Sequence, residues 1–193
     1  FINGAIYLKE QGFDAVEINA AGNNIGQAFF SRQRNHREDE YGPQSFENRA
    51  RFVGEIVAGI KEACGSDFPV QILINGIEEN DIELGESSLS TTVEENCEIC
   101  KVLESYGADS LHVRLGVFRM HVNQFGTAAN GAQFDFSRHF QGKLLANHSG
   151  CGMMLNVAKQ IKDAVSIPVG TVTYMDPAHA PKMFEDALKD GLC

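Results

Sequence analysis

Short apolar runs alternate with segments of helical periodicity along the chain, and this alternation constrains the fold more than any other feature. Four apolar runs have the length of strands, at residues 13–19, 70–74, 110–114 and 168–173. Helical patterns cover residues 1–11, 45–64, 92–107, 151–165 and about 181–190. Strands that alternate with helices are typical of βαβ units. The sequence therefore predicts an α/β fold built on a parallel sheet.

Two of the expected helices carry start signals. Ser45 precedes an amphipathic segment and is a good N-cap residue. Thr91 and Thr92 lie three residues before Glu94 and Glu95, which is the spacing of a capping box. These signals predict where the second and third helices begin.

Composition limits the size of the fold and the class of partner. The chain has 193 residues, 43% of them hydrophobic, whereas a complete (β/α)8 barrel typically needs about 250 residues. A net charge of -10 argues against nucleic acid or an anionic membrane as the main partner, because both are bound by basic surfaces. No apolar run approaches the roughly 20 residues that span a bilayer.

The cysteines indicate a reducing compartment. There are five, and they are scattered along the chain, so they do not suggest a disulfide framework and fit a cytoplasmic protein. Cys97 and Cys100 form a C-x-x-C pair. Both fall on the apolar stripe of an expected helix, which favours a core position over a redox or metal-binding role.

Polar residues alternate with apolar ones in three of the expected strands. Because successive side chains point to opposite faces, one face carries Glu17, Asn19, Gln71, Leu73, His112 and Arg114. The apolar residues between them suit a face covered by helices, so we expect this set on the other face. Polar groups packed there need partners. We therefore expect Glu17 and Arg114 to form an ion pair or a hydrogen-bonded set, with His112 nearby.

The polar segment 30–52 resembles the loop after the fourth strand in the old yellow enzyme family, especially its branch of 2,4-dienoyl-CoA reductases and bacterial NADH:flavin oxidoreductases. The family pattern reads N-x-R-x-D-E-Y-G and then S-x-E-N-R-x-R-F. The matching residues are Asn35, Arg37, Asp39, Glu40, Tyr41, Gly42, Ser45, Glu47, Asn48, Arg49, Arg51 and Phe52. We expect most of them to fix the loop to its helix and to the mouth of the barrel.

The resemblance implies a partial (β/α)8 TIM barrel. The chain would correspond to strands four to seven with their helices, as a single domain over residues 1–193 that is truncated at both ends. Such a sheet has open edges, which invite pairing with other strands. We therefore expect a homo-oligomer or a part of a longer chain.

At the fourth strand the resemblance also places candidate catalytic residues. The family reads V-E-I-H-G-A-H/N-G-Y, where the His and His/Asn bind a substrate carbonyl and the Tyr can donate a proton. Asn19 takes the place of the first His, Gly22 of the second, and Asn24 of the Tyr. Asn19 can still donate a hydrogen bond, whereas Gly22 offers only its backbone and an amide is no proton donor.

This chain also differs from the family pattern at the positions that contact the flavin. Leu73 stands where the family has an Arg beside the flavin ring, and Arg114 on the neighbouring strand is a candidate to supply that charge; the alternative is a structural role. Thr173 and Tyr174 stand where a Gly-Gly pair cradles the FMN phosphate.

Further candidates lie in the long segment 115–150, from which the reductase branch contributes a catalytic His. His139 and His148 are candidate proton donors there, against the simpler reading of solvated residues. The histidines of the chain lack metal-ligand spacing.

The resemblance thus implies an FMN-dependent NAD(P)H oxidoreductase of the ene-reductase type, which reduces an activated C=C bond of a small unsaturated molecule. Two alternatives stay open. The first is a barrel-derived module without flavin chemistry that serves assembly or ligand binding. The second is an active flavoprotein with a rearranged site.

Overall fold

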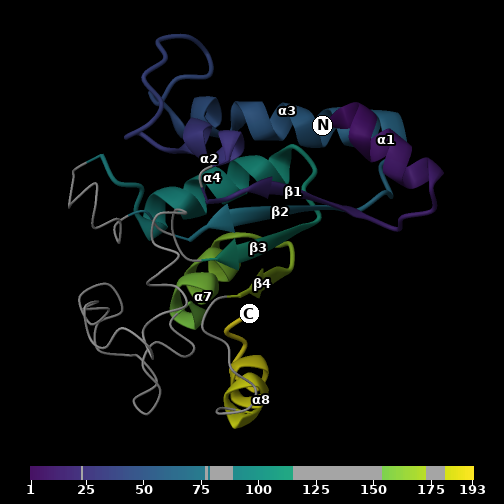
Figure 1. The fold of residues 1–193 in the computed structure, drawn as a ribbon. Coiled ribbons are helices and arrows are strands. Elements are labelled where there is room, and N and C mark those ends of the chain that lie inside the picture. Colours follow the sequence, from purple (N-terminus) through teal and green to yellow (C-terminus); the bar gives the residue numbers. More distant parts are fainter. Residues whose placement is uncertain (23, 77, 79–88, 115–153, 173–180) are drawn as a thin grey trace, which may run out of the picture.

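A four-stranded parallel sheet, in the order β1-β2-β3-β4, forms the centre of the molecule (Figure 1). The computed structural model describes residues 1–22, 24–76, 78, 89–114, 154–172 and 181–193. The strands are β1 (Val16–Ala20), β2 (Val70–Asn75), β3 (Ser110–Arg114) and β4 (Val169–Thr171). The helices are α1 (Ile2–Glu10), α2 (Ile25–Phe30), α3 (Phe46–Cys64), α4 (Val93–Ser105), α7 (Leu155–Ala164) and α8 (Pro181–Lys189). Sheet order thus follows chain order, as the resemblance to a barrel implies.

Among the described residues, helices pack against one face of the sheet and leave the other face uncovered. Ile72, Leu111 and Val113 have no exposed area, because α3, α4 and α7 pack over this side. The residues between them in sequence are half-buried or exposed. We call their side of the sheet the bare face; it carries Glu17, Asn19, Gln71, Leu73, His112 and Arg114. The predicted division of the strands into two faces is confirmed.

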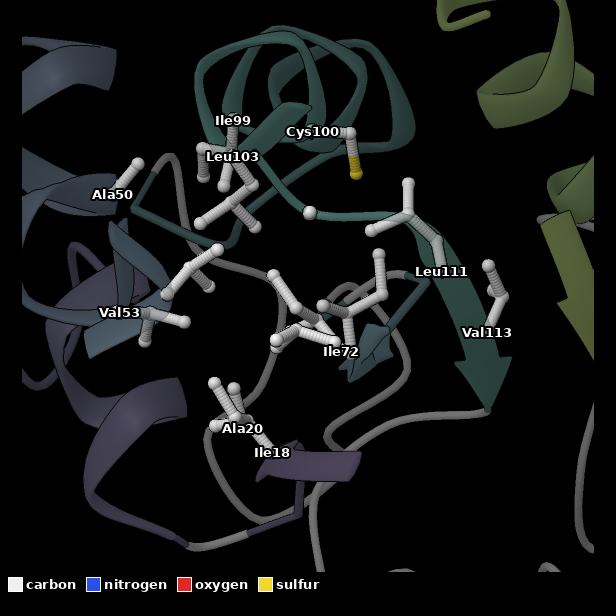
Figure 2. Packing of buried hydrophobic residues seen from close by; sticks show 14 of the residues in the cluster. Ile18, Ala20, Ala50, Val53, Ile72, Ile99, Cys100, Leu103, Leu111 and Val113 are labelled. Carbon is white, nitrogen blue, oxygen red and sulfur yellow. The ribbon is translucent and has the colours of Figure 1, made fainter. Parts of the chain in front are cut away.

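The core lies between the sheet and its helices (Figure 2). Ile18 and Ile72 from the strands meet Val53 of α3 and Leu103 of α4 in this layer. A buried aliphatic side chain stabilises the fold by about 1.5–3 kcal/mol relative to an exposed one, so this layer contributes most of the favourable free energy.

The two cysteines of the C-x-x-C pair are part of this packing. Cys100 is fully buried and points into the core, and Cys97 packs against its margin. Burial raises the pKa of both thiols, which disfavours the reactive thiolate. The predicted core position is confirmed.

Both helix-start signals are confirmed. Ser45 Oγ accepts a hydrogen bond from the backbone N–H of Asn48 at 3.1 Å. At α4, Thr92 Oγ1 accepts from the N–H of Glu95 at 3.3 Å, and Glu95 Oε2 accepts from the N–H of Thr92 at 3.4 Å. This pair satisfies two backbone donors that the first helical turn leaves without partners.

The structure corrects one boundary and adds a helix. β1 begins at Val16 rather than residue 13, and Phe13 is 57% exposed. Helix α2 was not predicted, because six residues are too few to show a periodicity. Gly26 allows its close approach: a Cβ there would lie 2.7 Å from that of Ala20. The segments 115–150 and 151–153, the latter predicted to start a helix, lie outside the described residues.

Candidate active site at the carboxyl ends of the strands

The loop between α2 and α3 is fixed at several points, as predicted. Asn35 is buried, and its amide donates to the carbonyls of Phe29 at 3.0 Å and Tyr41 at 2.7 Å. The hydroxyl of Tyr41 in turn donates to Glu55 of α3 at 2.9 Å. Arg51 Nε donates to the carbonyl of Glu40 at 2.9 Å. These contacts hold the loop against α3 and close to the carboxyl end of β1.

Beneath this loop lies a buried polar cluster, which we call the Glu78 cluster: Gln27, Ser31, Arg49, Glu78 and Thr91. The carboxylate of Glu78, only 3% exposed, accepts hydrogen bonds from Gln27 Nε2 at 2.6 Å and Ser31 Oγ at 3.1 Å. It also accepts from the backbone N–H of Thr91 at 3.1 Å and from its hydroxyl at 2.8 Å. Four donors, two from the α2 segment and two from Thr91 just before α4, therefore meet at one carboxylate.

Arg49 completes the cluster from α3. It is 2% exposed, and its Nε donates to the carbonyl of Phe30 at 2.6 Å while another nitrogen donates to Thr91 Oγ1 at 2.9 Å. Burial lowers the pKa of this guanidinium, and Glu95, 3.5 Å away, works in the opposite direction. The predicted role of Arg49 in pinning the loop to its helix is confirmed.

On the bare face, strand register brings one row of residues side by side. Asn19 of β1 pairs with Leu73 of β2, Leu73 with His112 of β3, and His112 with Gly170 of β4. The row thus has an apolar centre at Leu73, with polar side chains on either side. A Cβ at Gly170 would meet nothing within 4 Å, so the row ends in open space.

Glu17 reaches across β2 to His112. Its Oε2 lies 2.9 Å from Nδ1 of His112, and the two side chains are 37% and 31% exposed. Sequence reasoning placed these residues on one face and expected Glu17 to pair with Arg114; the contact of Glu17 in the described residues is with His112. Burial lowers the pKa of the Arg114 guanidinium, which lies beside Asn75 in the register.

Three residues in and after β1 differ from the family pattern. Asn19 is exposed, and its Oδ1 accepts from the N–H of Ala21 at 3.2 Å. Gly22 has a φ of 65°, a conformation that favours glycine, and its N–H donates to Oδ1 of the buried Asn75 at 2.9 Å. Asn24 is the exposed N-cap of α2 and makes no side-chain capping bond.

The structure therefore brings some of the predicted site residues together. Asn19, Leu73 and Arg114 share the bare face. Asn24 lies instead at the start of α2, beyond the end of β1. His139, His148, Thr173 and Tyr174 lie outside the described residues.

Sequence comparison places this arrangement in a family. The model of the NADH:flavin oxidoreductase / NADH oxidase family matches residues 1–134. The chain belongs to this family. It is 33% identical over 192 residues to an NADH oxidase of Thermoanaerobacter brockii, covering 98% of this chain and 25% of that protein. It is also 29% identical over 207 residues to a cinnamate reductase of Clostridium sporogenes, covering 99% of this chain and 26% of that protein.

Solved structures of the family agree with the fold. A 2-naphthoyl-CoA reductase in complex with 2-naphthoyl-CoA superposes with a TM-score of 0.74 at 27% identity, covering 99% of this chain and 24% of that one. An old yellow enzyme homologue from Zymomonas mobilis gives 0.60 at 20% identity, covering 98% of this chain and 43% of that one. The chain is a partial (β/α)8 barrel and spans about a quarter of the length of the first two relatives. In a closed barrel the bare face lines the interior.

Sequence reasoning missed part of this site. Glu78 was read as one of many polar residues in a loop, and Thr91 only as a helix-start signal. Glu17 and His112 were placed on the correct face but not among the catalytic candidates. The available signal was their position: both stand at inward positions of strands, where an ionisable side chain needs a partner.

Proposed function

We propose that the chain is part of an FMN-dependent NAD(P)H oxidoreductase of the ene-reductase type. The observation that carries this proposal is the match to the NADH:flavin oxidoreductase / NADH oxidase family, together with a bare face whose polar row lies near the carboxyl ends of the strands. In (β/α)8 barrels that end of the strands holds the active site.

The relatives support a carbonyl-conjugated C=C bond as the substrate. One is named for cinnamate, and another was solved with 2-naphthoyl-CoA. Both ligands place a carbonyl group next to carbon–carbon unsaturation. We therefore propose an unsaturated acid, ketone or thioester as the substrate class, with NAD(P)H as the source of the hydride.

The chemistry of the bare face fits FMN in part. Leu73 offers an apolar floor for a flat ring, and Arg114 a guanidinium on the neighbouring strand for its anionic reduced state. Thr173 and Tyr174 would contribute to the phosphate site, by resemblance to the family. When bound, FMN would supply hydride transfer, while the protein supplies binding and orientation.

A second candidate function is a barrel-derived module without flavin chemistry. The observation that favours it is at Gly22, where the family pattern has a side chain that binds the substrate carbonyl. The backbone N–H of Gly22 is already used by Asn75 at 2.9 Å, so it is not available to a ligand. Asn24 and Leu73 likewise lack the chemistry of the residues they replace.

A visible absorption spectrum separates the two candidates. Protein purified without added cofactor should show a flavin band, or gain one on addition of FMN, and NADH should bleach it under anaerobic conditions. A colourless protein that does not bind FMN would contradict the flavin proposal. Arg114→Met should weaken FMN binding or slow its reduction, whereas Lys182→Met, on the exposed surface of α8, should do neither.

We also propose that the outer edges of β1 and β4 are covered by other strands. In the described residues these two strands are the first and the last of the sheet. Unpaired edges present backbone donors and acceptors to any available strand. A second copy of the chain or further strands of a longer polypeptide would cover them, and light scattering that gives a monomeric mass would exclude the first.

A further inference from the structure

Reduction of a C=C bond needs a proton as well as a hydride. In the family pattern the proton donor is a Tyr at the position of Asn24, and an amide cannot take that role. Among the described residues of the bare face, His112 carries an imidazole, the side chain that most often serves as a general acid. We propose that His112, held by Glu17, donates the proton to the substrate carbon; this inference rests on the proposed function.

The contact with Glu17 prepares His112 for this role. A carboxylate accepts hydrogen bonds, so Nδ1 of the ring carries the proton in the 2.9 Å contact. This fixes the ring and leaves Nε2 as the nitrogen that exchanges a proton with a ligand.

The register sets the spacing of the groups that would meet a substrate. Asn19 and His112 are two strands apart, or about 10 Å at the usual strand spacing, with Leu73 between them. A flat substrate lying over this row would therefore have the Asn19 amide at one side and the imidazole at the other. Beyond His112, Gly170 has no side chain and leaves the approach open.

Among the described residues, two charged side chains share the bare face with His112. Glu17 faces it from β1, and Arg114 follows two residues later on the same face of β3. β2 contributes the uncharged Gln71 and Leu73, and β4 contributes Gly170. In this part of the chain Glu17 is therefore the carboxylate that orients the ring.

The proton step balances in atoms and electrons. The C=C bond gains hydride at one carbon, and its electron pair forms a new C–H bond at the other carbon with the proton from Nε2. The Nε2–H bond breaks, the ring becomes neutral, and water returns the proton. Asn19 is placed to donate a hydrogen bond to the carbonyl oxygen of the substrate.

The test compares two electron acceptors on the same FMN-loaded protein. NADH reduces the flavin anaerobically, and its reoxidation is then followed by stopped flow with 2-cyclohexenone, which needs a proton, or with ferricyanide, which takes only electrons. His112→Asn should slow reoxidation by the enone about 100-fold, the low end of general acid catalysis, and leave ferricyanide within about twofold. His36→Asn, an exposed histidine of the loop, should change neither rate.

Two further variants report on the contact between Glu17 and His112. Glu17→Leu removes the acceptor for Nδ1 and frees the ring to turn, whereas Glu17→Gln keeps an acceptor. The enone rate should therefore fall in Glu17→Leu and be largely retained in Glu17→Gln, with no change in the ferricyanide rate of either variant. A merely structural contact would lower both rates together.

Failure of the role of His112 and failure of the proposed function give different results in this experiment. Unchanged enone rates in His112→Asn, equal loss with both acceptors, or equal enone rates in Glu17→Leu and Glu17→Gln would overturn the role of His112 while the flavin function stands. A protein that binds no flavin, or whose flavin NADH does not reduce, would overturn the proposed function and this inference together.

Discussion

The Glu78 cluster and the bare face both gather polar side chains, but they use them differently. In the Glu78 cluster the carboxylate accepts four internal hydrogen bonds, and Arg49 is 2% exposed with three polar contacts. On the bare face the Glu17–His112 contact joins two side chains that are each about one-third exposed. Polar groups whose hydrogen bonds are all made inside the protein have a structural role. Partly exposed polar groups can still form hydrogen bonds to a ligand.

The difference also explains the substituted family positions. The loop signature is largely intact, because Asn35, Tyr41 and Arg49 make contacts that hold the barrel mouth together. Asn19 and Leu73, by contrast, stand on the bare face, where a change leaves the core in place. The loop and the side chains of the bare face can therefore vary independently.

The largest effect is expected at Glu78. Glu78→Gln replaces an acceptor of four hydrogen bonds by a group that must turn an NH2 toward one set of donors, which should cost about 3 kcal/mol of unfolding free energy. Urea denaturation followed by circular dichroism measures it. Glu62→Gln, at an exposed position of α3, is the control and should cost less than about 0.5 kcal/mol. A cost below that value for Glu78→Gln would mean that the cluster is not structural.

A smaller effect is expected at Thr91, whose hydroxyl donates to Glu78 and accepts from Arg49. Thr91→Val keeps the shape and removes both bonds, so we expect a loss of about 2 kcal/mol in the same urea experiment. Thr92→Ser, the next residue, retains a capping hydroxyl and should stay within about 0.5 kcal/mol. Equal losses in the two variants would assign the effect to the helix cap instead.

The smallest effect is expected on the bare face. Gln71→Met should change the unfolding free energy by less than about 0.5 kcal/mol, because the side chain is only partly buried and not in the core. The neighbouring Ile72→Val, on the helix-covered face, should cost about 1 kcal/mol. If Gln71→Met proved the more costly of the two, the distinction between the faces would fail.

Much of the frame could be predicted from sequence because it follows from local patterns. The spacing of apolar residues gave the alternating strands and helices, and Ser45 and Thr92 marked two helix starts. Helix α2 was not predicted because it is short and contains Gly26. That glycine matters through its contact with Ala20, which only the folded chain shows.

The site was harder to predict because its contacts join distant parts of the chain. Gln27 and Glu78 are 51 residues apart, and Glu17 and His112 are 95 apart. Strand alternation shows which face a side chain takes but not how far neighbouring strands are shifted. Only the register, in which Glu17 lies two residues short of the row of His112, reveals that they meet diagonally across β2.

The alternation along β2 has a consequence for how new activities arise on this barrel. Ile72 is held in the core, whereas its neighbours Gln71 and Leu73 have no such duty. Mutations at the latter two can be sampled without first acquiring a compensating change in the packing. A combinatorial library restricted to Glu17, Asn19, Gln71, Leu73 and His112 should therefore retain a high share of folded members, which makes this strand face a natural starting point for directed evolution.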